Sequence, residues 1–138
     1  MNLKEGFQIF DPPVFIPWDI SESKLKTIVP EDALNYVTRG YYTVKCEPLP
    51  GVKCHLGFHF RNSSKLNELQ FFRTAYPDLT ASFTEFQSAA EAAFGKPTHS
   101  TQGSDGFLDH EWRIPGAKVY HYIFDRFGLE EHMKIVRH

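Results

Sequence analysis

The sequence has no long apolar run, no block of like charge and little cysteine. No window approaches the roughly 18 apolar residues of a membrane span, and the opening MNLKEGFQIFDPP lacks the pattern of a signal peptide, so we expect a soluble cytoplasmic protein. Fifteen Lys and Arg against seventeen Asp and Glu give a formal charge of −2, without the concentrated positive charge that binds phosphates. Neither nucleic acid nor a membrane is therefore an expected partner.

Sequence motifs for cofactor or metal chemistry are also missing. The chain has no GxGxxG, Walker loop, GxSxG, HExxH or EF-hand pattern, so we predict no cofactor and no metal site. The two cysteines, Cys46 and Cys54, are spaced to lie opposite each other in a hairpin. Because no export signal is seen, we expect two reduced, buried thiols in place of a disulfide.

What the chain has in quantity is aromatic side chains. Thirteen Phe, six Tyr and two Trp are many for 138 residues, and aromatic residues favour strands and bury large areas. A chain of this length can bury a core without disulfide or metal support. We therefore predict a single α+β domain over residues 1–138, with a mainly antiparallel sheet of about six strands and helices packed on one face.

Helical patterns occur in three places. Asp19 or Ser21 can cap a short helix that Pro30 ends, and the residues EDALNYV, from 31 to 37, suggest a second helical turn. The strongest pattern predicts one long helix over about residues 82–94, where Ser82 with Glu85 fits a capping box and GKP supplies the stop. The proline-rich FDPPVFIPW before these helices is expected to be extended or irregular.

Alternation of period two predicts the strands. It runs through residues 41–47, 52–60 and 66–72, and again through 107–114, 117–125 and about 130–136. The polar segment 98–106 between the long helix and the last three strands is predicted to be a mobile loop. The predicted register leaves each strand with an apolar face toward the core and a polar face away from it.

One predicted hairpin carries the only hint of catalytic chemistry. A turn at IPGA places His110 opposite His121 and Trp112 opposite Val119 on the apolar face. Opposed imidazoles are close enough to share a proton, a water or a metal ion. The alternative interpretation is that both are hydrogen-bonded core residues, and their apolar neighbours favour it.

The face away from the core carries a second set of candidates. His55 and His59 lie four residues apart, about 13 Å along a strand, which is too far for both to bind one metal ion. The same register brings them together with residues of the next strand, so that the exposed patch consists of His55, His59, Glu68, Gln70 and Phe72. Such a face is either solvated or binds a partner, and an exposed Phe72 favours the second.

The order of these features resembles small bacterial α+β proteins, many uncharacterised and some acting as toxin-immunity proteins. The resemblance covers nearly the whole chain and is carried by an IPW-like entry with a short helix, the strands HLGFHF and KLNELQFF, a helix ending AAFGKP and a late strand near Trp112. It implies a protein that binds another protein and performs no reaction. The binding surfaces vary among such proteins, so no functional residue is carried over.

Three hypotheses follow. The first is a non-catalytic protein-binding protein, such as an immunity or inhibitory factor against a toxin or enzyme, which uses the patch or the loop at 98–106. The second is a small-ligand-binding protein or enzyme with an aromatic pocket that contains His110 and His121. The third is a subunit that forms a homodimer through an exposed strand edge.

Overall fold

The computed structural model describes residues 2–60, 66–73 and 78–138. Two helices, a short 3₁₀ turn and ten strands follow one another along these residues. In chain order they are β1 (Gly6–Ile9), β2 (Val14–Pro17), α1 (Glu22–Ile28), β3 (Leu34–Thr38), β4 (Tyr41–Leu49), β5 (Val52–His59), β6 (Glu68–Phe72), α2 (Leu79–Phe94), β7 (His99–Gln102), η1 (Ser104–Gly106), β8 (Leu108–Ile114), β9 (Ala117–Asp125) and β10 (Leu129–Arg137).

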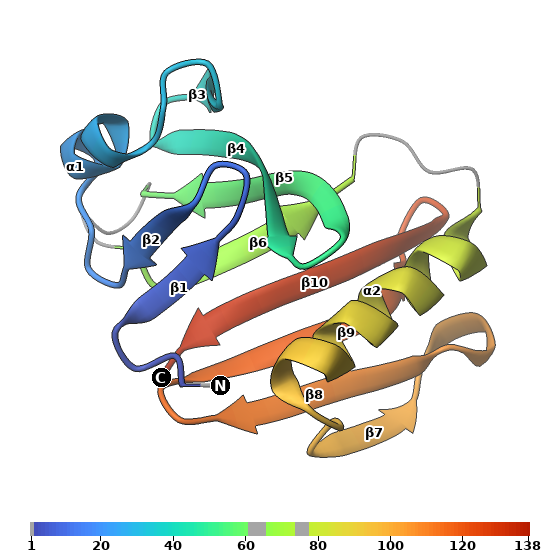
Figure 1. Cartoon of the computed structure of the whole chain (residues 1–138). Coiled ribbons are helices and arrows are strands. Elements are labelled where there is room, and N and C mark those ends of the chain that lie inside the picture. The colour runs from blue at the N-terminus through green and yellow to red at the C-terminus, as the bar shows by residue number, and fades with distance from the viewer. Residues whose placement is uncertain (1, 61–65, 74–77) are drawn as a thin grey trace.

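The main sheet is antiparallel throughout, and its strand order is β3-β4-β5-β6-β10-β9-β8-β7 (Figure 1). The α+β class and the large antiparallel sheet are thus as predicted, but the prediction of about six strands is wrong. In the described part of the chain, eight strands form the main sheet and two more form a separate hairpin, β1-β2. The sheet joins two meanders, because the last strand, β10, pairs with β6 along Met133 to Val136.

Helices and hairpin cover one face of this sheet, here called the inner face. Figure 1 shows α1 and β1-β2 in front of one half and α2 in front of the other. Alternation sends one side of each inner strand into the core between them, and the fully buried side chains include Phe58, Leu69, Trp112, Val119 and Ile135. Because aromatic and aliphatic side chains bury large areas, these layers hold the two meanders together.

The two helices begin at polar caps. Ser21 caps α1, where its hydroxyl accepts a hydrogen bond from the Lys24 amide, as predicted. For α2 the predicted capping box is wrong, because the cap is Asp78, whose carboxylate accepts from the Thr80 amide. Ser82 lies one turn inside the helix and is buried, so its hydroxyl points toward the sheet instead of the helix end.

Several segments with little apolar pattern are strands. The proline-rich N-terminal segment, predicted to be extended or irregular, is extended and belongs to the β1-β2 hairpin, in which Phe7 pairs with Ile16. The predicted second helical turn at 31–37 is instead the edge strand β3, so α1 is the one helix before the sheet in the described residues. The segment 98–106, predicted to be a loop, contains the opposite edge strand β7 and the turn η1.

The described part of the chain contains no helix with the length and apolar composition that crossing a membrane requires.

Candidate functional site

The hairpin that holds the two candidate histidines has the predicted register. His110 is the partner of His121, Trp112 of Val119, and the turn is closed by Ile114 and Ala117. The two imidazole rings lie with their centroids 6.4 Å apart on the inner face, beneath α2. The prediction from alternation is therefore confirmed, and the chemistry depends on what else touches the rings.

Every polar atom of His121 is engaged by its surroundings. The residue is fully buried, its Nδ1 lies 2.8 Å from Oε1 of Gln87, and its Nε2 lies 2.6 Å from Oε2 of Glu131. The ring of Phe83 stacks on the imidazole with centroids 4.0 Å apart. Ser82 donates its hydroxyl hydrogen to the other oxygen of Glu131. Because both ring nitrogens are hydrogen-bonded and the ring is fully buried, neither nitrogen is accessible to a substrate or a metal ion.

His110 has a different environment at the edge of the helix. Its Nδ1 lies 2.8 Å from the hydroxyl oxygen of Ser100 on β7, and its ring lies beside Trp112 with centroids 6.0 Å apart. Burial, and secondarily the neighbouring His121, lower the pKa of His110 from its ordinary value. The two histidines therefore have separate partners, and the structure does not show them sharing one ligand.

The two cysteines also lie as the register predicts. Cys46 and Cys54 are opposed on β4 and β5, both are buried, and both are free thiols. Burial raises the pKa of Cys46 to about 12, and burial also raises that of Cys54. A thiol that resists ionisation is a poor nucleophile, so the pair belongs to the core.

The five residues of the predicted exposed patch lie together on the outer face of β5 and β6. His55 is opposite Phe72, and the Nε2 atom of His59 lies 3.3 Å from Oε1 of Gln70. Glu68 reaches Lys134 on β10, with Oε1 and Nζ 3.7 Å apart. All five side chains are at least partly accessible. The patch is thus one surface, and it continues onto β10.

The position of the Phe72 ring on the outer face has a structural explanation. Its ring covers Gly57, the residue next to it across β5 and β6, and a Cβ atom added to Gly57 would meet the Phe72 ring at 2.7 Å and the Tyr41 hydroxyl at 3.1 Å. Tyr41 in turn stacks on His59, with ring centroids 4.2 Å apart. The glycine therefore allows two aromatic rings to lie flat on the sheet, which leaves Phe72 only 37% exposed.

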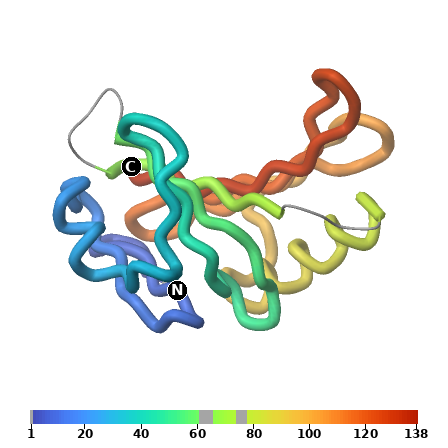
Figure 2. Tube along the Cα trace, turned by 90° about the horizontal axis from the view of Figure 1, so that it is seen from above, coloured from blue at the N-terminus to red at the C-terminus, as the bar shows by residue number. Residues whose placement is uncertain are grey.

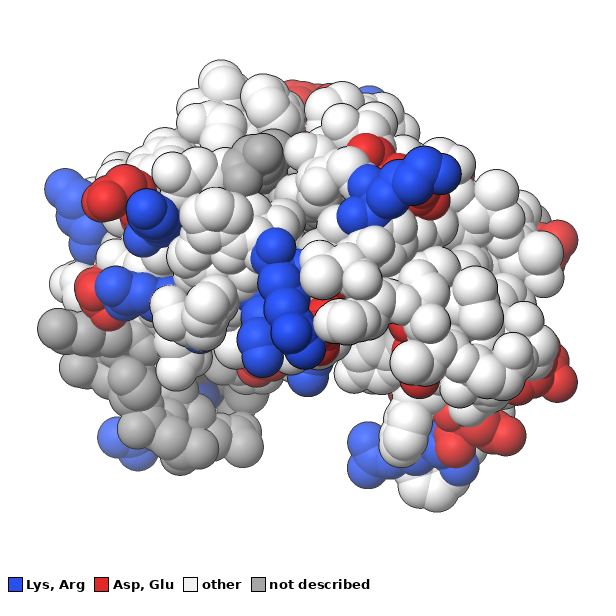
Figure 3. Space-filling model, turned by 90° about the horizontal axis from the view of Figure 1, so that it is seen from below, with Lys and Arg blue, Asp and Glu red and all other residues white. Residues whose placement is uncertain are grey.

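The outer face is concave. In Figure 2 the β3-β4 turn and the tip of the β9-β10 hairpin both rise on the side of the sheet away from the helices. Between them lies a hollow of about 820 Å³, which appears as the indentation in the lower edge of Figure 3. Its lining comes from β6 to β10 and consists of Glu68, His99, Thr101, Asp109, His110, Glu111, Arg113, Tyr120, Tyr122, Lys134 and Val136, so the candidate residue His110 also borders it.

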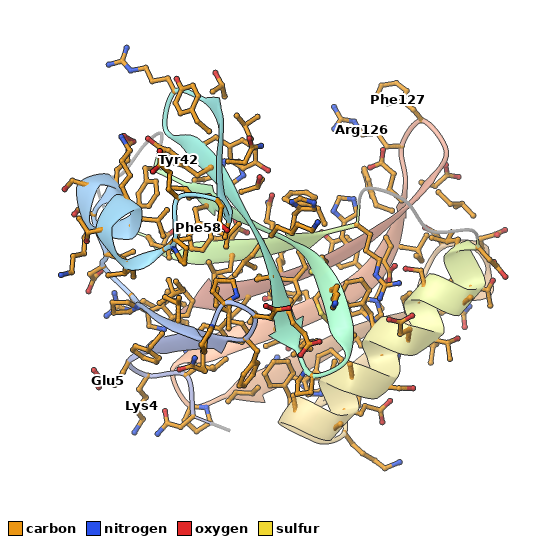
Figure 4. The ribbon with its side chains drawn as sticks, turned by 45° about the horizontal axis from the view of Figure 1, so that its top comes forward. Lys4, Glu5, Tyr42, Phe58, Arg126 and Phe127 are labelled. Carbon is orange, nitrogen blue, oxygen red and sulfur yellow. The ribbon has the colours of Figure 1, made fainter. Side chains whose placement is uncertain are left out.

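One part of this face was missed by the sequence analysis. Three of the outward side chains of β9 are aromatic, and we call Tyr120, Tyr122 and Phe124 the aromatic stripe; Lys118 precedes them on the same face. It ends near the hairpin tip, where Phe127 is 90% exposed (Figure 4). The signal was the alternation YHYIF, in which every outward position is aromatic although that face was predicted to be polar.

Comparisons of the chain with protein-family models, with curated proteins and with solved structures find no match.

Proposed function

We propose that this chain is a non-catalytic protein that binds another protein through the concave outer face of its sheet, as an immunity or inhibitory factor does. The observation that carries the proposal is the composition of that face. It combines a hollow, aromatic rings and histidines, and it has no covering layer in the described structure. Exposed aromatic side chains on an uncovered face, such as Phe72 and Phe124, are typical of sites that bind partners.

Charge on the face supports a protein as the partner. Two pairs of acidic and basic side chains lie on it, Glu111 with Arg113 at 2.8 Å and Glu68 with Lys134 at 3.7 Å. A surface whose charges alternate in sign has no strong field to attract a polyanion. It can instead form a polar rim around an apolar contact, which is the usual arrangement of protein interfaces.

The alternative function, a ligand pocket or active site around His110 and His121, receives less support. General acid or base catalysis needs a ring nitrogen within reach of the substrate. In His121 both nitrogens are hydrogen-bonded and the residue is fully buried. The patch of His55, His59, Glu68, Gln70 and Phe72, by contrast, is accessible without any rearrangement.

The proposal is tested by identifying the partner and then changing the face. The tagged full-length chain is expressed in the cells that naturally produce it, proteins that copurify are identified by mass spectrometry, and the affinity of each purified candidate is measured. Glu68→Lys and Gln70→Lys place new charge on the face and should each weaken binding at least tenfold, which is the size of effect seen at interface centres.

Glu22→Lys is the matched control, because Glu22 lies on α1 on the opposite side of the sheet. It should leave the affinity unchanged. Phe72 is not used for this test, because its ring also covers Gly57 and its loss would alter the sheet itself. Absence of any specific partner, or full retention of binding by both face variants, would overturn the proposal.

A further inference from the structure

The two cysteines of the chain occupy directly opposed positions on neighbouring strands. Cys46 of β4 is the register partner of Cys54 of β5, and both side chains lie in the core on the inner face, where they are 3% and 5% exposed. Burial raises the pKa of the Cys54 thiol, and the nearness of Cys46 raises it further. The two thiols are therefore close neighbours in space as well as register partners.

The backbone hydrogen bonds of β4 define the kind of pair that the cysteines form. The amide of Lys45 donates to the carbonyl of Ala33, which lies on the β3 side of β4, away from β5. Successive residues of a strand direct their backbone groups to opposite sides, so those of Cys46 point toward β5. Cys46 and Cys54 therefore form a hydrogen-bonded pair, in which the Cα atoms are about 5.5 Å apart.

This spacing allows a disulfide, but only with strain. A disulfide joins Cα atoms that are about 4.4–6.8 Å apart, and the pair lies within that range. The Cβ atoms of directly opposed residues, however, are about 4.5–5.5 Å apart, whereas a disulfide holds them at about 3.5–4.5 Å. The two strands must therefore be drawn together by about 1 Å. Strained disulfides are the more easily reduced ones, so a bond at this position should be reversible.

The backbone around the pair is free to make this adjustment. The β4-β5 ladder shifts its register directly after Cys46 and resumes where Leu49 pairs with Val52. On the other side, β5 pairs with β6 through residues 55–58, so Cys54 lies just outside that ladder. A ladder that is interrupted by a bulge bends more easily than a continuous one. The cysteines thus lie at the position where β4 and β5 are least constrained by their neighbours.

A hollow of about 400 Å³ reaches Cys54 from the surface. Three cationic side chains and one carboxylate line it together with the cysteine, and the full lining is Lys45, Gly51, Lys53, Cys54, His55, Arg73 and Glu85. Positive charge near a cysteine favours its thiolate and attracts negatively charged reagents. Glutathione disulfide, a low-molecular-weight disulfide that carries carboxylates, matches the charge of this hollow.

We propose that Cys46 and Cys54 are a redox-sensitive pair, which glutathione disulfide oxidises to a cross-strand disulfide and glutathione reduces again. First, the thiolate of Cys54 attacks one sulfur of glutathione disulfide, whose S–S bond breaks, and one glutathione leaves as a thiolate. Next, the thiolate of Cys46 attacks the Cys54 sulfur of this mixed disulfide, and the second glutathione leaves. The two protons of the protein thiols pass to the two glutathione thiolates, and the two electrons that the protein loses reduce the reagent. Burial of the thiols slows both steps but does not set the equilibrium.

The test equilibrates the purified full-length chain in glutathione buffers that range from the reducing poise of a cytosol to the oxidising poise of an endoplasmic reticulum. Remaining thiols are alkylated, and trypsin then cuts after Lys45 and Lys53, so that the disulfide joins peptide 46–53 to peptide 54–61. Mass spectrometry measures the joined and the separate peptides. The ratio of disulfide to dithiol should change at least about tenfold between the two ends of the range.

The matched control moves one cysteine to a diagonal position on the same face. Val44→Cys combined with Cys46→Ser keeps two cysteines in the chain, but residue 44 is opposite Leu56, so the new thiol is diagonal to Cys54. Diagonal residues are about 7–8 Å apart, which is beyond the reach of a disulfide. This variant should form no internal disulfide in the same buffers. Circular dichroism checks that it remains folded.

Several outcomes would overturn the redox proposal. One is a dithiol in every buffer, even after a higher pH and a low concentration of urea have speeded the exchange. Others are products that are only mixed disulfides with glutathione or covalent dimers, or a disulfide that resists reduction at the cytosolic poise and is thus a permanent cross-link. Equal oxidation of the diagonal control would show that the bond forms in an opened chain and not in this register. None of these outcomes bears on the proposed binding function.

Discussion

The two faces of strand β9 reverse the usual distribution of side chains. On the inner face, between Val119 and Ile123, lies the fully buried His121, whereas the outer face carries the aromatic stripe. Buried polar groups and exposed aromatic surfaces are the informative exceptions in a folded protein. The comparison teaches that alternation alone does not show which face of a strand is closed by packing and which remains accessible.

The physical reason why the buried histidine is tolerated differs from the reason why the exposed aromatic rings are tolerated. On the inner face a buried polar group is tolerated because each of its atoms has a partner: Gln87 and Glu131 for His121, and Ser82 for Glu131. On the outer face the aromatic rings are partly covered by long neighbours, as in Tyr122 on His132 and Lys134 over Tyr120. On the inner face the hydrogen-bonding groups are buried and satisfied, whereas on the outer face the aromatic rings remain partly accessible.

The largest expected effect comes from opening the inner network. Glu131→Ala should lower the free energy of unfolding by about 3–5 kcal/mol, because it leaves His121 and Ser82 buried without their shared partner. Urea denaturation followed by circular dichroism measures the loss. Glu130→Ala is the control, since this neighbour points to the other face, is half exposed and should change stability by no more than about 0.5 kcal/mol.

Equal losses in Glu131→Ala and Glu130→Ala would contradict the distinction between the two faces. The variant Glu131→Gln tests the same distinction more finely. The amide keeps the shape of the carboxylate and can still bond one neighbour, so its loss should fall between those of the other two variants.

A smaller effect is expected on the outer face, at the glycine beneath Phe72. Gly57→Ala should lower the free energy of unfolding by about 1 kcal/mol, because the new methyl group displaces the Phe72 ring that lies 2.7 Å from its position. In a Phe72→Ala background the same change should cost much less. Urea denaturation of the two single variants and the double variant gives the coupling, and strictly additive losses would show that the ring does not depend on the glycine.

The smallest effect concerns the pH dependence of stability and involves His110. Burial, and then the proximity of His121, hold the pKa of His110 below its ordinary value, so below about pH 6.5 the unfolded chain binds this proton more readily than the folded one. The stability that neutral His110 preserves is present above that pH and is lost as the pH falls through its folded pKa. The effect is limited because His110 is only partly buried and solvent screens it.

His110→Gln should therefore show a shallower loss of stability between pH 7 and about pH 5 than the original chain, as measured by urea denaturation at each pH. His99→Gln on the exposed edge strand β7 is the control and should follow the original curve. A curve for His110→Gln that also matches the original would mean that this residue does not contribute to the acid sensitivity.

Much of the fold could be predicted where one strand face is apolar. The partners His110 with His121, Cys46 with Cys54 and Leu56 with Phe71 follow from alternation and turn position, because a shift of one residue would turn every side chain to the wrong face. The same reasoning brought the five patch residues onto one surface. It failed at β3 and β7, whose mostly exposed side chains carry no such pattern.

The candidate site was only partly predictable for a related reason. Alternation showed that His121 points inward, but its partners Gln87 and Glu131 come from α2 and β10, 34 and 10 residues away in the chain. The alternating aromatic residues of the stripe on β9 can be read from the sequence. Their exposure, however, depends on the absence of a helix over the outer face of the described structure. No local pattern contains that information.

The sequence by itself determined the class of fold, the presence of the long helix, the register of the β4-β5, β5-β6 and β8-β9 pairs and the inward direction of their core residues, since these depend on side-chain period and on turns between neighbouring segments. The tertiary structure alone decided that β10 joins the two meanders at β6, that α2 closes over His121, and that the outer face is hollow. Those outcomes depend on packing between segments far apart in the chain, whose free energies no short stretch of sequence records.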